Sequence, residues 1–294
     1  MSSLDLVKLT ALMELTSGRA KTRVGLIDGP VAISHPDLNA ENVREIPGKL
    51  RGTCAQANSA ACLHGTFVAG ILCAKRDSIA PAICPNCTLL VRPIFAETAT
   101  GNGQMPSATP EELATAIIDC VDAGARVINL SAALAHPSSK GERQLEEALD
   151  YASKRHVIVV VAAGNQGTIG SSAITRHPWV IPVVACDLQG RPISYSNLGS
   201  SIGRRGLSAP GEDISSLGAD GKQLSLGGTS AAAPFVTGAI ALLCSEFPSA
   251  TVGQVKNAVT QCYALRRTAL VPPVLNAWAA YQLMATSYTR RRTS

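Results

Sequence analysis

Short runs of consecutive apolar residues alternate along this chain with segments in which apolar residues recur every three or four positions. Apolar runs without internal alternation are typical of strands that are buried on both faces of a sheet. They lie at residues 24–27, 88–94, 126–131, 157–161 and 180–186. The helical spacing predicts helices over residues 5–16, from 64 onward, 109–124, 141–156, from 230 onward, 249–262 and 276–286. Strands that alternate with helices predict an α/β fold with a mostly parallel central sheet, right-handed crossovers and helices on both faces.

The stretch 228–234, Gly-Thr-Ser-Ala-Ala-Ala-Pro, marks the point where an extended segment gives way to a long apolar helix. Small neighbours leave the Ser230 hydroxyl uncovered, and a helix N-terminus offers unpaired N–H groups and partial positive charge. A proline is tolerated in the first turn of a helix, so we expect Pro234 to lie there. Taken alone, Ser230 is better explained as a serine that caps a helix.

Composition limits the class of protein. No linker or repeat divides the chain, so residues 1–294 are predicted to form one domain, with a solvated basic tail at 290–294. The 46% hydrophobic and 16% charged content is that of a globular chain rather than a disordered one. The net charge of +5 lies partly in that tail and is too small to indicate a nucleic-acid-binding surface.

We also expect no membrane-spanning segment and no signal peptide. A cytoplasmic location is therefore expected, and the oligomeric state stays open.

Four polar residues stand at the ends of predicted elements. Asp28 follows the first strand, Asn165 follows the fourth, and His64 and Ser230 lie at helix starts. Each alone has an ordinary structural explanation, such as a turn residue, a helix cap or a satisfied histidine. Together they supply a nucleophile, a base, an acceptor that orients the base, and an amide donor for an oxyanion. Because strand ends of a parallel sheet share one edge, we expect the four side chains to meet there.

Five segments match one family pattern in the right order. They are 24–29 (Val-Gly-Leu-Ile-Asp-Gly), 64–70 (His-Gly-Thr-Phe-Val-Ala-Gly), 127–131 (Val-Ile-Asn-Leu-Ser), 162–165 (Ala-Ala-Gly-Asn) and 228–234. With them the chain resembles the subtilisin-like serine proteases, the subtilase family, over nearly its whole length. The resemblance implies a three-layer subtilisin-like fold, with Asp28 orienting His64, His64 as base and then acid, and Ser230 as nucleophile. It also implies an oxyanion hole formed by the Asn165 side chain and the Ser230 N–H, and no cofactor.

The resemblance further implies that an extended peptide binds as an added strand between two backbone segments. The implied substrate-binding residues are Gly101, Asn102, Gly103, Ser131, Ala132, Ala133, Ala163 and Gly164. Residues 27–36, 84–95 and 209–214 more closely resemble the subtilisin-like maturation proteases that trim cyanobactin and related ribosomal peptide precursors. The implied partner is therefore a peptide or protein substrate, such as a ribosomally made precursor.

The chain departs from the family pattern in two places. Residues 131–134, Ser-Ala-Ala-Leu, stand where the family has Ser-Leu-Gly-Gly, and the two extra side chains could narrow the cleft. The calcium-binding loop of the family is replaced by residues 75–78, Lys-Arg-Asp-Ser, so we expect no structural calcium and no other metal.

The nine cysteines are scattered rather than evenly framed. Those in apolar runs are predicted to be reduced core residues: Cys73, Cys120, Cys186 and Cys244. The pair Cys84 and Cys87 is compatible with a disulfide or with two plain thiols. Zinc, which would need Cys54 and Cys62 as further ligands, is less favoured.

The sequence leaves three possible functions. Peptide-bond hydrolysis is favoured. A macrocyclase would capture the acyl-enzyme with an amine of the substrate, but relatives of that kind carry a helical insertion for which residues 67–93 are too short. A non-catalytic scaffold is disfavoured because Asp28, His64, Asn165 and Ser230 are all present.

Overall fold

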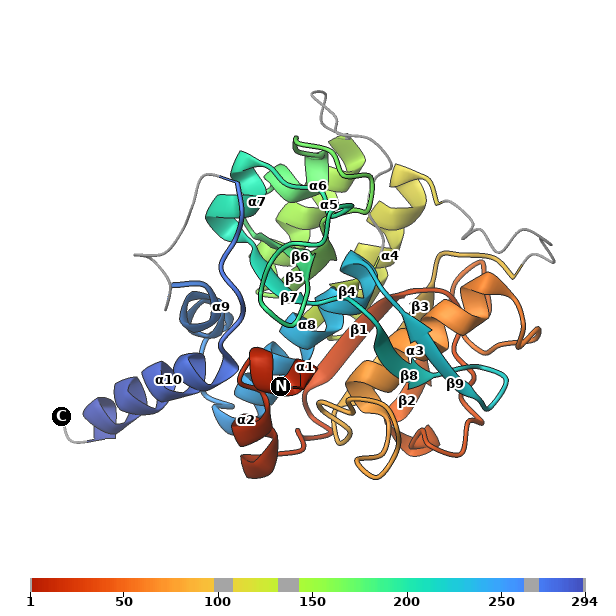
Figure 1. Cartoon of the computed structure of the whole chain (residues 1–294), viewed down its shortest axis with the longest axis horizontal. Helices are drawn as coiled ribbons and strands as arrows, with labels where there is room; N and C mark the ends of the chain where they lie inside the picture. The colour runs from red at the N-terminus through yellow and green to blue at the C-terminus, as the bar shows by residue number, and fades with distance from the viewer. Residues whose placement is uncertain (1, 98–107, 132–142, 262–269, 293–294) are drawn as a thin grey trace.

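The computed structural model describes residues 2–97, 108–131, 143–261 and 270–292 (Figure 1). Its centre is a seven-stranded sheet in the order β2-β3-β1-β4-β5-β6-β7, in which every neighbouring pair is parallel. Its strands are β1 (Arg23–Asp28), β2 (Val43–Glu45), β3 (Thr88–Pro93), β4 (Val127–Leu130), β5 (Ile158–Ala162), β6 (Val180–Cys186) and β7 (Leu207–Pro210). A separate antiparallel hairpin joins β8 (Ile214–Leu217) to β9 (Gln223–Leu226). The expected α/β fold with a mostly parallel central sheet is confirmed.

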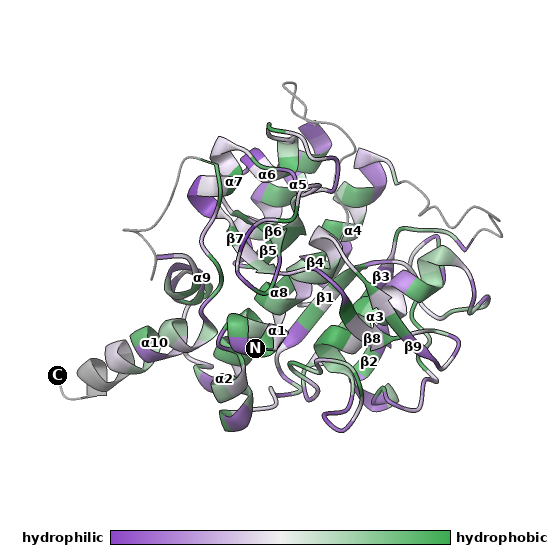
Figure 2. Cartoon of the chain, in the orientation of Figure 1, coloured by the Kyte–Doolittle hydropathy of each residue, from purple (hydrophilic) through white to green (hydrophobic). Residues whose placement is uncertain are grey.

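Helices cover both faces of this sheet (Figure 1). The described helices are α1 (Ser3–Leu6), α2 (Thr10–Leu15), η1 (Ala40–Asn42), α3 (Ala60–Cys73), α4 (Pro110–Asp122), α5 (Arg143–Lys154), α6 (Ala173–Arg176), α7 (Ser200–Arg205), α8 (Thr229–Glu246), α9 (Val252–Gln261) and α10 (Ala277–Arg292). The strand residues alternate between two apolar clusters. Leu26 belongs to the cluster that includes α3 and α8, and its neighbour Ile27 belongs to the cluster that includes α4 and α5. Figure 2 shows the hydrophobic colour concentrated on these central elements.

Helix α8 runs through the middle of the first cluster. Among the described helices it alone has the length and hydropathy needed to cross a membrane, which the sequence pattern had not led us to expect. However, 89% of the segment is buried inside the protein. It is therefore accounted for as the core helix of a globular fold.

Several boundaries differ from the sequence-based expectations. α3 begins at Ala60, four residues before His64, because Ser59 accepts a hydrogen bond from the Cys62 N–H and caps the helix there. The helix expected over 5–16 is two short helices, separated at Lys8, whose φ is 54°. The short elements β2, β7, β8, α6 and α7 were not expected, because pieces of three to six residues carry little periodic signal.

Two glycines allow α3 to pack closely against the loop that follows β1. A Cβ atom at Gly65 would collide with the carbonyl oxygens of Gly29 and Pro30, and one at Gly29 would collide with the Ala61 carbonyl. Backbone therefore packs against backbone here. This contact sets the position of His64, the residue before Gly65, relative to Asp28 at the end of β1.

We expect Gly65→Ala to lower the free energy of unfolding by about 1–3 kcal/mol, because the new methyl group forces α3 away from the loop. Urea denaturation followed by circular dichroism measures this change. The matched control is Gly253→Ala in α9, where the nearest atom, Thr251 Oγ1, lies 4.0 Å from the added Cβ. It should be neutral or stabilising. Equal stability of the two variants would contradict the proposed close packing.

Candidate active site

The carboxyl edge of the sheet gathers the four polar residues expected from the sequence. β1 ends at Asp28, β5 ends three residues before Asn165, and α3 and α8 begin near this edge with His64 and Ser230 in their first two turns. Parallel strands place all of their carboxyl ends on the same side, so residues far apart in sequence come together.

Asp28 and His64 form a buried pair. The His64 Nδ1 atom lies 2.7 Å from Asp28 Oδ1, and the two side chains are 13% and 0% exposed. The Gly29 N–H donates to the same oxygen at 2.6 Å. Among the described residues, Asp28 Oδ2 has no hydrogen-bond partner. The carboxylate thus concentrates its interactions on one oxygen, which holds the imidazole ring by its Nδ1 side.

This environment shifts the proton affinity of the ring. Burial lowers the pKa of His64, but the negative charge of Asp28 and its hydrogen bond raise that pKa by more, so the net value lies above the ordinary one. With Nδ1 facing the carboxylate, Nε2 is the ring nitrogen left for exchange with a substrate or a nucleophile.

Ser230 is the second residue of α8 and is partly exposed. The helix follows Gly228, whose φ of 108° lies in the region that favours glycine. Pro234 is the sixth residue of the helix, so the expectation that it lies in the first turn is wrong. Proline lacks the N–H that would bond to the Ser230 carbonyl four residues earlier. The Ser131 hydroxyl supplies that bond instead, donating to the Ser230 carbonyl at 3.2 Å.

Asn165 is held by the residue that precedes Ser230. Its Oδ1 atom accepts from the Thr229 N–H at 2.9 Å and from the Thr229 hydroxyl at 3.0 Å. Because both bonds use the amide oxygen, the Nδ2 group is directed elsewhere and is available to donate. A Cβ atom at Gly228 would lie 2.9 Å from Nδ2 and 3.1 Å from Oδ1, so the Asn165 amide packs against the residue that precedes α8.

The loop between β5 and Asn165 is held on two sides. The Gly164 N–H donates to the Thr229 hydroxyl at 3.1 Å, and Gly164 has a φ of 108°. The Asn197 amide donates to the Ala163 carbonyl at 3.3 Å and accepts from the Gln166 N–H at 3.0 Å. These bonds fix Ala163 and Gly164, two of the expected substrate-binding residues, beside the start of α8.

The structure describes only some of the other expected site residues. Ser131 is buried at the end of β4, where the Asn129 amide donates to its hydroxyl at 2.7 Å. Five expected substrate-binding residues lie outside the described residues: Gly101, Asn102, Gly103, Ala132 and Ala133. Among the described contacts, no hydrogen bond joins His64 to Ser230, so proton transfer between them stays a prediction. Catalytic hydrogen bonds often tighten only when substrate binds.

Two residues that hold other side chains in place at this edge were not identified from the sequence. Thr229 orients Asn165, and its place beside Ser230 in the Gly-Thr-Ser motif was the available signal. Asn197 holds residues 163–168 through four side-chain hydrogen bonds, but it lies in a loop with no motif around it. Only its position in space reveals its role.

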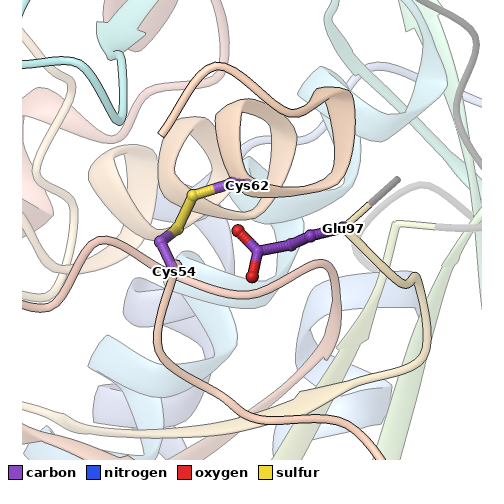
Figure 3. Close-up of side chains that lie close together, drawn as sticks. All are labelled: Cys54, Cys62 and Glu97. Carbon is purple, nitrogen blue, oxygen red and sulfur yellow. A yellow bond between two sulfur atoms is a disulfide. The ribbon is translucent and has the colours of Figure 1, made fainter. Parts of the chain in front are cut away.

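The cysteines fall into two groups. Cys54 and Cys62 form a disulfide with a Cα–Cα distance of 5.7 Å (Figure 3). The other described cysteines carry free, buried thiols: Cys73, Cys84, Cys87, Cys120, Cys186 and Cys244. The core thiols were expected, and of the two alternatives for Cys84 and Cys87 the structure has the thiols. Zinc binding by both pairs together is contradicted, because Cys54 and Cys62 bond to each other.

Comparisons with known sequences agree with this geometry. A sequence profile of the subtilase family matches residues 19–272. Subtilisin DY of Bacillus licheniformis is 32% identical over 243 residues, which cover 81% of this chain and 82% of the relative. The chain spans less of some longer relatives. It covers 61% of the thermostable alkaline protease of Halalkalibacterium halodurans, at 31% identity over 81% of this chain.

Solved structures give the same result. A mutant of the protease domain of PatA superposes with a TM-score of 0.83 at 31% identity, covering 92% of this chain and 97% of that one. The prenylagaramide maturation protease PagA gives 0.80 at 29% identity, covering 94% and 98%. A PatG macrocyclase bound to peptide gives 0.79 at 20% identity, covering 92% and 94%, and this similarity shows the fold alone. By profile, sequence and fold, the chain belongs to the subtilase family of serine peptidases.

Proposed function

We propose that this chain is an endopeptidase that trims a ribosomally made precursor peptide, with Ser230 as nucleophile. The observation that carries the proposal is the buried Asp28–His64 pair at the same sheet edge as the start of α8. A histidine held by its Nδ1 side offers Nε2 as a base, and the helix start offers a partly exposed serine near the positive end of the helix dipole.

The chemistry follows from these positions. His64 Nε2 takes the proton of the Ser230 hydroxyl as its oxygen bonds to the substrate carbonyl carbon. The resulting oxyanion accepts from the Asn165 Nδ2 group and the Ser230 N–H, near the positive end of α8. The His64 cation, stabilised by Asp28, then protonates the leaving amine. A water molecule, deprotonated by the same histidine, releases the acyl group.

The class of substrate rests on backbone recognition and on similar proteins. Pairing of an extended peptide with residues 101–103 and 131–133 would read the backbone more than the side chains. Two similar structures are described as maturation proteases, for patellamide and for prenylagaramide. We infer a peptide substrate of the same kind. We also propose a cytoplasmic location; six described cysteines carry free thiols, and one described pair forms a disulfide.

Hydrolysis is favoured over macrocyclisation by the length of one connection. α3 ends at Cys73 and β3 begins at Thr88, and the described residues between them contain no helix. No helical cover over the site is built from this segment, so water reaches the acyl-enzyme. Product masses distinguish the two reactions, because a cyclic product lacks the water that hydrolysis adds.

We expect Ser230→Ala to reduce kcat by about 10⁶-fold, the loss that removal of the same serine causes in subtilisin, a member of this family. A fluorophosphonate probe should label Ser230 in the parent protein, as located by peptide mass mapping. Ser200→Ala, at an exposed serine that begins α7, is the matched control. Full activity or full labelling of Ser230→Ala would remove the proposed nucleophile.

The activity should fall on acidification through the raised pKa of His64, because the base is effective only when neutral. In the pH profile of kcat/KM, the acid limb should therefore lie above the ordinary histidine value of about 6.5. Asp28→Asn removes the charge that raises this pKa, so the limb should move to lower pH and kcat should drop by about 10⁴-fold. Asp150→Asn, which alters an exposed carboxylate paired with His177, should leave the limb in place. An unmoved limb in Asp28→Asn would refute the assignment.

We expect Asn165→Ala to lower kcat by about 10²–10³-fold with little change in KM, because its amide acts on charge that develops in the transition state. Steady-state kinetics on a chromogenic peptide separates the two constants. Asn257→Ala, at an exposed asparagine of α9, serves as the control. A change confined to KM would mean that Asn165 only binds substrate.

A further inference from the structure

A cluster of three potential metal ligands lies at the start of the helix that carries His64. Cys54 belongs to the loop before α3, Cys62 to the first turn of α3, and Glu97 to the segment after β3. The two sulfur atoms and a carboxylate oxygen lie within 4.8 Å of one another. Figure 3 shows the Glu97 carboxylate directed at the disulfide. We call these residues the Cys54–Cys62–Glu97 cluster.

The carboxylate of this cluster is held in place by the loop. Glu97 accepts from the Ala55 N–H with both oxygens at 3.0 Å and from the Gln56 N–H at 2.7 Å. The Ser59 hydroxyl donates to it at 3.4 Å. Glu97 Oε1 accepts three of these bonds, but Oε2 accepts only the shared bond from the Ala55 N–H, so Oε2 has a lone pair left for a cation. The position of the carboxylate is therefore set before any cation binds.

The disulfide is accessible from one side. Cys54 is partly exposed, whereas Cys62 is fully buried. A small dithiol reductant would attack Cys54 Sγ as a thiolate, so that the disulfide breaks and Cys62 leaves as a thiolate. The second thiol of the reductant then closes its own disulfide and releases Cys54. Two electrons pass to the protein, and the reductant ends as a cyclic disulfide.

We propose that the reduced Cys54–Cys62–Glu97 cluster binds one Zn²⁺ ion. Two thiolates and one carboxylate form a donor set that suits Zn²⁺, with a water molecule in the fourth position. Bonds of about 2.3 Å to sulfur and about 2.0 Å to oxygen place ligand atoms roughly 3.5–4 Å apart. In the disulfide the two sulfur atoms are bonded to each other, so after reduction side-chain rotation must move them apart to this spacing, whereas a carboxylate oxygen of Glu97 already lies within 4.8 Å of both. Binding releases the two thiol protons to solvent.

The ion would replace the disulfide as the cross-link between the loop before α3 and the first turn of that helix. In the oxidised protein the S–S bond ties the loop before α3 to the first turn of that helix, two residues before His64. In the reduced protein the metal joins the same two residues and adds Glu97. The N-terminus of α3 thus stays cross-linked under reducing conditions.

The test uses Co²⁺ as a spectroscopic probe for the zinc site. The full chain is reduced with a dithiol, desalted without oxygen and titrated with Co²⁺. We expect a near-ultraviolet thiolate-to-cobalt band at one equivalent that Zn²⁺ abolishes by displacement. The oxidised protein should not show the band. Absence of the band from folded, reduced protein would overturn the proposal.

Variants assign the ligands. Cys54→Ser with Cys62→Ser should abolish the band, and Glu97→Gln should weaken Co²⁺ binding by at least about tenfold. Glu41→Gln, at an exposed glutamate of η1, is the control and should bind as the parent does. A band that survives the double serine variant would assign the metal to other thiols and refute the site. If that variant does not fold, the reduced parent protein is alkylated with iodoacetamide in the presence of Zn²⁺. The proposal requires that Zn²⁺ protects Cys54 and Cys62, and alkylation of both would overturn it.

A stability measurement tests the metal cross-link. A zinc chelator should lower the Tm of the reduced, zinc-loaded protein and leave the Tm of the oxidised protein unchanged. Equal Tm values for the reduced protein with and without chelator would show that no metal cross-link supports α3.

Discussion

The buried pairing of Asp28 with His64 is the constraint around which this edge of the molecule is arranged. A carboxylate with no exposure is costly unless its charge is compensated by hydrogen bonds and an opposite partner. The His64 ring and the Gly29 N–H supply that compensation through one oxygen. The pair forms only because α3 packs backbone to backbone against the loop after β1, which requires Gly65. Close packing thus sets His64 against the carboxylate that raises its pKa.

Residues 228–234, at the start of α8, anchor the Ser230 carbonyl, orient Asn165 and provide partial positive charge. Pro234 leaves the Ser230 carbonyl without its helical donor, and the Ser131 hydroxyl donates to it instead, which ties Ser230 to the end of β4. Thr229 uses its N–H and hydroxyl to hold the oxygen of Asn165, so the amide nitrogen is left to donate to the oxyanion in the proposed mechanism. The first N–H groups of the helix add partial positive charge. In the proposed mechanism these groups would stabilise the transition state without rearrangement during the reaction.

Under the two proposals above, the support of the helix that carries His64 would connect catalysis to the redox state of the protein. Cys54 and Cys62 close a short loop at the N-terminus of this helix, and Glu97 accepts hydrogen bonds from the same loop. Because Glu97 also follows β3, which pairs with β1, the cluster links the catalytic helix to the sheet edge that bears Asp28. A Zn²⁺ ion in the reduced cluster would preserve this link where the disulfide opens.

The sequence by itself determined the buried strands and the four residues of the candidate site, because long apolar runs and the motifs at their ends are local signals. It could not determine that Cys54 pairs with Cys62, that Thr229 and Asn197 position Asn165 and its loop, or that Pro234 lies in the second turn. Short strands such as β7 were also beyond it. Those features depend on distances between segments that meet only after the sheet forms, and spacing along the chain does not encode such distances. The sequence supplies the chemical groups, and tertiary packing determines which of them are in contact.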